Sequence, residues 1–172
     1  MFFPAPMILT TNRLTLKPMA QSDAPALFAI LGDPDAMRFW QRPPVQRLAV
    51  VEEMVREQIA AAPLCRYWTV WRGGDAIGSC DLSFISPEDG QAQTGFLFRR
   101  DRWGQGFATE AMAAVTAHAF GPLGLSLVIA RTHVANLRAR RLLERLGFAL
   151  DRTEESDAPG IAMPVAVYLL HP

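Results

Sequence analysis

A glycine-rich stretch in the second half of the chain has the composition of a phosphate-binding turn. Gly104 and Gly106 stand between a strand-like run at residues 94–98 and a run rich in helix formers at residues 110–120. Glycine adopts φ angles that other residues resist, and it lets the backbone approach a ligand closely. The amide groups at the start of the following helix lie at the positive end of its dipole, where a phosphate binds well. The spacing predicts an anion-binding turn, with an ordinary glycine-softened helix start as the alternative.

Two well-known phosphate loops do not fit these residues. A Walker loop requires a Lys-Ser or Lys-Thr pair directly after its second glycine, and no such pair follows here. A Rossmann turn requires a third glycine, where Thr109 stands, and an acidic residue about 20 residues further on. His133 and Val134 lie in that downstream region. Residue type therefore excludes both classes of nucleotide site.

Length and composition are typical of a compact globular protein. The 172 residues predict one domain, residues 1–172, with half of them hydrophobic and 20% charged. Lys and Arg number 17 and Asp and Glu also number 17, so net charge gives no reason to expect nucleic acid or a membrane as partner. Cys65 and Cys80 have neither metal-ligand nor disulfide-framework spacing, and we expect no metal. Neither a signal peptide nor an apolar run near the ~20 residues of a membrane span is recognisable, which predicts a cytoplasmic protein.

The spacing of apolar residues and turn formers predicts a series of strands and helices. Asn136 and Gly147 are typical of the start and the end of the last helix. The order β-α-α-β-β-β-α-β-α-β-β predicts an α/β fold in which helices flank a mixed sheet. Strands are expected at residues 9–17, 67–71, 76–85, 91–99, 126–132, 148–152 and 162–170, and helices at 24–31, 45–62, 109–120 and 136–146.

Three segments in register resemble the GNAT family of N-acetyltransferases. Residues 102–111 resemble the acyl-CoA pyrophosphate loop, and residues 136–148 resemble the Asn-led helix that ends in Leu-Gly-Phe. Residues 9–17 are similar to the first strand of the ribosomal-protein-alanine acetyltransferase-like subgroup. The resemblance implies a GNAT fold, α/β (α+β), with a mixed, mostly antiparallel sheet of about seven strands and about four flanking helices. It also implies that one parallel pair of strands splays apart.

The activity that this resemblance implies is acetyl transfer from acetyl-CoA, the cosubstrate, to a primary amine by direct attack on the thioester. The acceptor would be a protein N-terminus or a small-molecule amine, and a homodimer is left open. Among the arginines, Arg102 and Arg138 are expected at the 3′-phosphate of CoA. The implied cofactor-binding residues are Phe96, Leu97, Phe98, Arg102, Trp103, Gly104, Gln105, Gly106, Phe107, Ala108, Thr109, Asn136 and Arg138.

Two positions of the last helix depart from the family pattern. Ala139 stands where many members of the subgroup have a serine, and Leu143 where other branches have the tyrosine that protonates the leaving thiolate. A thiol has a pKa of ~8.5, so water can protonate a CoA thiolate. Tyr168 is the replacement acid that we name, with a packing role as its alternative. The two departures also leave open a non-catalytic acyl-CoA-binding or sensing module.

Attack on a thioester requires a neutral amine and therefore a base. Asp81, an acid among apolar strand residues, is the first candidate, and a solvent-facing carboxylate is the alternative. His133 is the second candidate, because histidine titrates near neutral pH. By resemblance, residues 33–44 line the amine site, where Asp35, Phe39 and Trp40 are expected to contact the acceptor. The two aromatic residues would equally suit a contact between helices.

Overall fold

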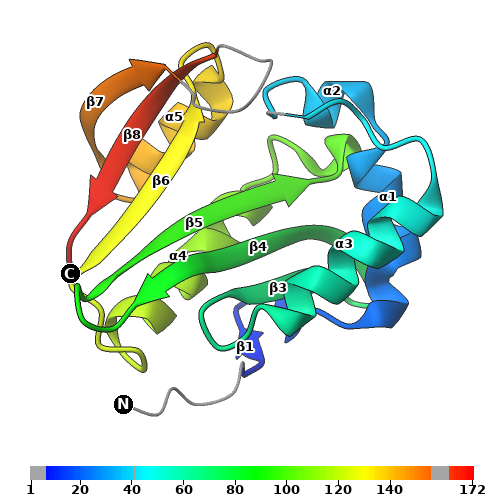
Figure 1. Ribbon diagram of the computed structural model, residues 1–172, viewed down its shortest axis with the longest axis horizontal. Coiled ribbons are helices and arrows are strands. Elements are labelled where there is room, and N and C mark those ends of the chain that lie inside the picture. Colours follow the sequence, from blue (N-terminus) through cyan, green and yellow to red (C-terminus); the bar gives the residue numbers. More distant parts are fainter. Residues whose placement is uncertain (1–6, 41, 156–162) are drawn as a thin grey trace.

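An eight-stranded sheet carries the fold in the computed structural model, which describes residues 7–40, 42–155 and 163–172 (Figure 1). The strand order is β1-β2-β3-β4-β5-β6-β8-β7, and every neighbouring pair is antiparallel except β5 and β6. The strands are β1 (Leu9–Thr10), β2 (Thr15–Pro18), β3 (Arg66–Arg72), β4 (Asp75–Ser86), β5 (Gln91–Phe98), β6 (Leu127–His133), β7 (Ala149–Glu155) and β8 (Pro164–Leu170).

Five α-helices of the described residues cover the two faces of this sheet (Figure 1). Helices α1 and α3 pack together on one face, while α4 and α5 lie on the other. Within those same residues, none of the helices is long and apolar enough to cross a membrane. The helices are α1 (Ala24–Leu31), α2 (Pro34–Met37), α3 (Leu48–Ala60), α4 (Phe107–Phe120) and α5 (Leu137–Arg145).

Side chains that alternate along the strands divide the core between these two faces. Trp68 on β3 and Leu82 on β4 are fully buried against α4 and α5. On the opposite face, Leu27 of α1 packs with Val51 and Val55 of α3. Burying apolar side chains on both faces fixes the register of the strands, because a slip of one residue would turn each side chain to the wrong face.

The expected mixed α/β sheet is confirmed, with corrections to individual elements. The single strand predicted at residues 9–17 is wrong: the chain turns at Thr11, whose amide donates to Leu14 O (3.0 Å), so that β1 pairs antiparallel with β2. Helix α3 is shorter than predicted and begins only at Leu48. The sequence does not predict the short helix α2, because Gly32, Asp33 and Pro34 together are typical of the end of a helix. Residue 162 of the last predicted strand lies outside the described residues.

The parallel strands β5 and β6 pair over their first halves and then separate. Their pairing runs from Gln91–Leu127 to Thr94–Ala130. Beyond that point β5 stays paired with β4 and β6 stays paired with β8, so the two strands diverge toward α2 (Figure 1). The splayed parallel pair that the resemblance implied is therefore present. The separation leaves a stretch of β5 backbone without a partner strand on its β6 side.

Candidate active site

A cleft of about 500 Å³ opens where β5 and β6 separate. Its walls come from β4, β5, β6 and the start of α5, and the segment after α2 adds further side chains. Residues far apart in the sequence therefore meet in one cavity. The sequence-predicted site residues that line it are Phe39, Trp40, Asp81, Phe96, Leu97, His133 and Asn136.

The glycine-rich turn lies between β5 and α4, as predicted. Gly104 and Gly106 adopt left-handed conformations, with φ of 74° and 80°, which only glycine takes without strain. A Cβ atom at Gly104 would meet nothing within 4 Å, so the backbone there is open to a ligand. Gly106 is the N-cap of the 14-residue helix α4, and no side chain of the described residues caps it. The first amide groups of α4, at Phe107, Ala108 and Thr109, are thus the available anion-binding groups, although the Phe107 side chain itself is buried.

The turn between β1 and β2 holds the glycine turn in place. Glu110, in the first turn of α4, accepts hydrogen bonds from Thr11 Oγ1 (2.6 Å) and from Arg13 N (2.8 Å). The Arg13 side chain pairs with Glu110 (2.6 Å) and also donates to Gln105 O (3.1 Å). Partial burial alone would raise the pKa of Glu110, but these hydrogen bonds lower it below its ordinary value. Glu110 is therefore a structural brace of the turn.

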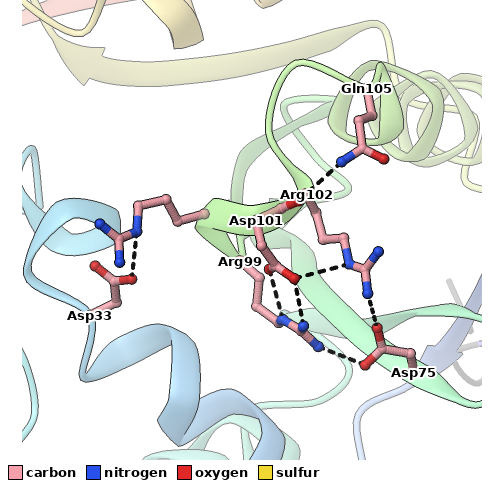
Figure 2. A network of polar contacts seen from close by, with 7 residues as sticks. Asp33, Asp75, Arg99, Asp101, Arg102 and Gln105 are labelled. Atoms are coloured by element: carbon pink, nitrogen blue, oxygen red, sulfur yellow. Dashed lines mark hydrogen bonds and ion pairs between the residues drawn. The ribbon is translucent and has the colours of Figure 1, made fainter.

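A network of ion pairs precedes the turn (Figure 2). Asp75, in the β3–β4 hairpin, binds both Arg99 (2.6 Å) and Arg102 (2.7 Å). Asp101 binds Arg99 (2.7 Å), and its backbone oxygen accepts from Gln105 Nε2 (3.0 Å). Arg102, which we expected at the 3′-phosphate, is thus held by a carboxylate of this chain. The network fixes the turn against the hairpin.

The start of α5 lies on the other side of the turn. The Arg138 guanidinium stacks over the Trp103 ring at 4.7 Å, and Trp103 Nε1 donates to Phe98 O (2.9 Å). The Asn136 side chain accepts a hydrogen bond from Ala139 N (3.3 Å) and so caps α5. Arg138 and Arg13 are both exposed cations next to the turn, and the phosphate contact of Arg138 stays a prediction. The Phe98 carbonyl, by contrast, is already occupied by Trp103.

Asp81 lies in the cleft with part of its carboxyl group buried. The Oδ1 atom is buried and has no hydrogen-bond partner among the described residues. Asp81 stands opposite Gly95 in the β4–β5 pairing, and a Cβ atom at Gly95 would lie 2.9 Å from Oδ1. Burial raises the pKa of Asp81 to about 6, against the smaller opposing influence of the Gly95 amide and the Ser83 hydroxyl. A carboxylate of this kind is mostly ionised at pH 7 and still accepts a proton readily, as a general base must.

The second base candidate, His133, is less suited to that role. Its Nδ1 accepts a hydrogen bond from Ala135 N (3.0 Å), so in the neutral ring the proton resides on Nε2. Neither ring nitrogen then has a free lone pair for an amine proton. The ring instead stacks against Phe39, with centroids 5.4 Å apart. His133 is a wall of the cleft, and Asp81 remains the base candidate.

The predicted acid Tyr168 and the predicted acceptor contact Asp35 both lie outside the cleft. Tyr168 is fully buried, and its hydroxyl accepts from Arg140 Nε (2.9 Å) and donates to Glu144 Oε1 (3.0 Å). These bonds tie β8 to α5 and leave no proton for a leaving group. Asp35 is exposed at the surface and pairs with Arg100 (2.6 Å). Neither residue touches the cavity.

Among the lining residues that the sequence does not predict are Tyr67, Phe84 and Gly95. Tyr67 pairs with Asp81 across β3 and β4, and burial together with that carboxylate raises the pKa of its hydroxyl. Phe84 lines the cleft from a bulge of β4. Gly95 makes room for the Asp81 carboxyl group. An isolated glycine in a strand pattern signals close approach of another group, so Gly95 was the detectable one.

The separated parallel strands and the glycine-rich turn that adjoins them are the features of an α/β acyltransferase fold. Residues 13–149 match the sequence model of the acetyltransferase (GNAT) domain, and the chain belongs to this family of N-acetyltransferases. The family that the three sequence segments predicted is therefore confirmed.

Individual relatives agree with this assignment. A protein of Bacillus licheniformis named uncharacterized N-acetyltransferase p20 is 29% identical over 144 residues, which cover 81% of each chain. The structure of RimL, a ribosomal L7/L12 alpha-N-protein acetyltransferase, in complex with coenzyme A has a TM-score of 0.87 at 17% identity, covering 96% of this chain and 98% of that one. Spermidine N-acetyltransferase from Vibrio cholerae, in complex with CoA and spermine, has a TM-score of 0.82 at 20% identity, covering 94% and 96%. At these identities the two structures establish a shared fold.

Proposed function

We propose that this chain binds acetyl-CoA in the cleft between β5 and β6 and transfers the acetyl group to a primary amine, at a protein N-terminus or on a small molecule. The observation that carries the proposal is the partly buried Asp81 carboxylate in the cavity beside the unpaired β5 backbone. The related structures support it, because RimL, a protein acetyltransferase, and spermidine N-acetyltransferase are both seen in complex with CoA.

The cofactor fits the groups that the chain offers. The amides that follow Gly104 and Gly106 suit the pyrophosphate, since the backbone at Gly104 is open and the dipole of α4 favours an anion. The unpaired side of β5 at Gly95, Phe96 and Leu97 offers backbone groups to the pantetheine arm. Asn136 lies in the same cavity. Arg138 is positioned to reach a 3′-phosphate while stacked on Trp103.

Asp81 accepts the proton that the amine must lose, directly or through one water molecule. The neutral nitrogen then forms a C–N bond to the acetyl carbon while the C–S bond breaks, and CoA leaves as the thiolate. The acylated nitrogen gives up its second proton to water, and the thiolate takes a proton from water, which its pKa of ~8.5 permits. Ala139 and Leu143 line the cleft with apolar side chains, so they contribute no acid. Holding the two reactants together contributes the larger part of the rate, up to ~7–11 kcal/mol of the barrier.

A non-catalytic acyl-CoA-binding module is the second candidate. The apolar Ala139 and Leu143 at positions that hold an acid in other family members favour it. A retained carboxylate whose pKa suits a base favours the enzyme instead. The two functions differ in whether the bound thioester is consumed.

The test combines CoA binding with thiol release. Wild-type protein should gain thermal stability with CoA, because a ligand that binds the folded state stabilises it. Gly106→Trp should abolish that gain. Gly124→Trp is the control, because Gly124 also has a positive φ (62°) but lies in the turn after α4, where an added Cβ would meet nothing within 4 Å. Thiol release from acetyl-CoA that depends on an added amine supports the enzyme. A stability gain with no release from any amine supports the binding module, and no gain at all refutes the cofactor assignment.

A further inference from the structure

Phe84 is the most exposed large hydrophobic side chain described, with 71% of its surface accessible. It lines the cleft from a bulge of β4, where the pairing with β5 shifts between Ser83 and Ser86. Its φ of 49° lies in the left-handed region, which is strained for a non-glycine residue. A phenylalanine that is both strained and exposed gains nothing from burial in the folded chain. Such strain concentrates where a residue contacts a ligand.

Two further aromatic side chains face the same cavity. Trp40 is 40% exposed, and Phe39 stacks on His133. Both follow the short helix α2, whose N-cap Asp33 forms an ion pair with Arg100 (3.3 Å). Aromatic surfaces of this size bind apolar groups by removing them from water. The cleft therefore has an aromatic wall that no packing within the described chain covers.

The same cavity has few charges. Asp81 is the one carboxylate among the described lining residues. Arg131 also lines the cleft, but it forms an ion pair with Glu154 of β7. A polyamine with several ammonium groups would find one carboxylate there. A free amino acid would bring its own carboxylate toward Asp81 and would meet an arginine that is already paired.

Uncharged hydrogen-bonding groups fit a peptide. Gln58 of α3, Gln93 of β5 and Ser83 of β4 line the cavity and offer amide and hydroxyl groups. These groups can pair with the backbone amides of an extended peptide. The α-amine of such a peptide would lie at Asp81, and Phe84 lines the same cavity from the same strand. An apolar first side chain would therefore lie beside the aromatic residues.

We propose that the acceptor is the α-amine of a peptide whose first side chain is apolar and packs on Phe84 and Trp40. This inference rests on the proposed acetyltransferase function and narrows its substrate class. Phe84 is the specificity-determining residue in this account.

Proton transfer to Asp81 points in the same direction. An α-ammonium group has a pKa of ~8, whereas a lysine-like ammonium group has a pKa near 10.4. A carboxylate with a pKa of about 6 therefore takes a proton from an α-amine about a hundredfold more readily than from an alkylamine.

The test measures thiol release with four acceptors: a peptide beginning with Leu, the same peptide beginning with Asp, free leucine, and spermidine. The Leu-first peptide should have a kcat/KM at least about tenfold above the other three. Phe84→Asn should raise KM for that peptide about tenfold, with a much smaller change in kcat and an unchanged affinity for CoA. The asparagine tolerates the left-handed conformation, so the variant should be at least as stable as wild type. Leu150→Asn on β7 is the control, because Leu150 is 48% exposed but lies outside the cleft.

Two results would overturn this inference while leaving the enzyme in place. One is a preference for spermidine, free leucine or the Asp-first peptide, and the other is an unchanged KM in Phe84→Asn. If wild-type protein binds CoA but releases no thiol with any of the four acceptors or with a wider amine panel, the acetyltransferase proposal itself fails and the inference falls with it.

Discussion

Replacing Asp81 by asparagine should lower kcat/KM and at the same time raise the stability of the folded protein. Loss of a general base typically lowers the rate ~10²–10⁴-fold. We therefore expect kcat/KM of Asp81→Asn at pH 7.5 to fall by at least about a hundredfold. In wild type, kcat/KM should rise with pH through a step near 6, as Asp81 loses its proton. The variant should lack that step.

The stability change follows from the same carboxyl group. Its pKa rises from 3.8 to about 6 on folding, so the folded protein holds this proton more tightly than the unfolded chain does. The folded protein is therefore most stable, as far as Asp81 is concerned, below pH 3.8, where this carboxyl group is protonated in both states. That contribution to stability is lost as pH rises through 6. The difference of about two pH units corresponds to about 3 kcal/mol of destabilisation at pH 8 and to roughly half of that at pH 5. Removing the charge should therefore make Asp81→Asn more stable, by up to about 3 kcal/mol at pH 8.

Urea denaturation of both proteins at pH 5 and pH 8, beside thiol-release kinetics over the same range, measures both effects. The account predicts an inactive variant whose stability advantage grows with pH. A variant that keeps the wild-type kcat/KM and its pH step would remove Asp81 as the base. A stability difference that does not change with pH would refute the assignment of a raised pKa.

Three further substitutions test individual contacts. Gly95→Ala places a methyl group 2.9 Å from Asp81 Oδ1, so it should lower kcat/KM and shift the pH at which kcat/KM rises on the acid side. A pH–rate profile measures both effects, and an unaltered profile would contradict the close approach of the two residues. Tyr168→Phe removes the hydroxyl between Arg140 and Glu144, so it should lower the free energy of unfolding by about 1–2 kcal/mol. The dependence of kcat/KM on pH should stay unchanged, and a changed dependence at alkaline pH would restore Tyr168 as an acid. Arg138→Ala should weaken CoA binding several-fold at low salt and less at high salt, measured by calorimetry; equal affinity at low salt would remove Arg138 from the phosphate site.

The elements that position the site could largely be predicted from the sequence. The glycine turn was recognisable because Gly104 and Gly106 stand between a strand pattern and a helix pattern, and both adopt the expected left-handed φ. Asn136 was recognisable as a helix cap for a similar local reason. Features that depend on a few neighbouring residues are readable in this way.

Strand register was less accessible. The Gly73–Gly74 turn pairs Arg72 with Asp75, and regular counting from there would place Tyr67 opposite Cys80. A bulge between Val70 and Trp71 shifts the pairing by one, so that Tyr67 faces Asp81. Gly78, an isolated glycine of β4 that pairs with Val70 at this shift, is a local signal of the bulge, but it does not give the new register. The second bulge, which presents Phe84 to the cleft, has no glycine to mark it.

Long-range ion pairs were also hidden. The residues next to Arg102 in the sequence suggest that its side chain is available to bind a phosphate. Its partner Asp75 lies 27 residues away in the chain, so local sequence does not reveal the ion pair. Tyr168 on an alternating strand could face either side, and the structure places it in the core. Such outcomes depend on how distant elements pack, which composition and periodicity do not report.

The measurement that tests the central claim most directly is a mass balance of the transfer reaction. Protein, acetyl-CoA and a Leu-first peptide are incubated together, and acetylated peptide and free thiol are quantified in the same sample. The account predicts equal amounts of the two products, with acetyl on the α-amine, and neither product from Gly106→Trp. Tight CoA binding with no acetylated product from this or any other amine would contradict it and identify an acyl-CoA-binding module.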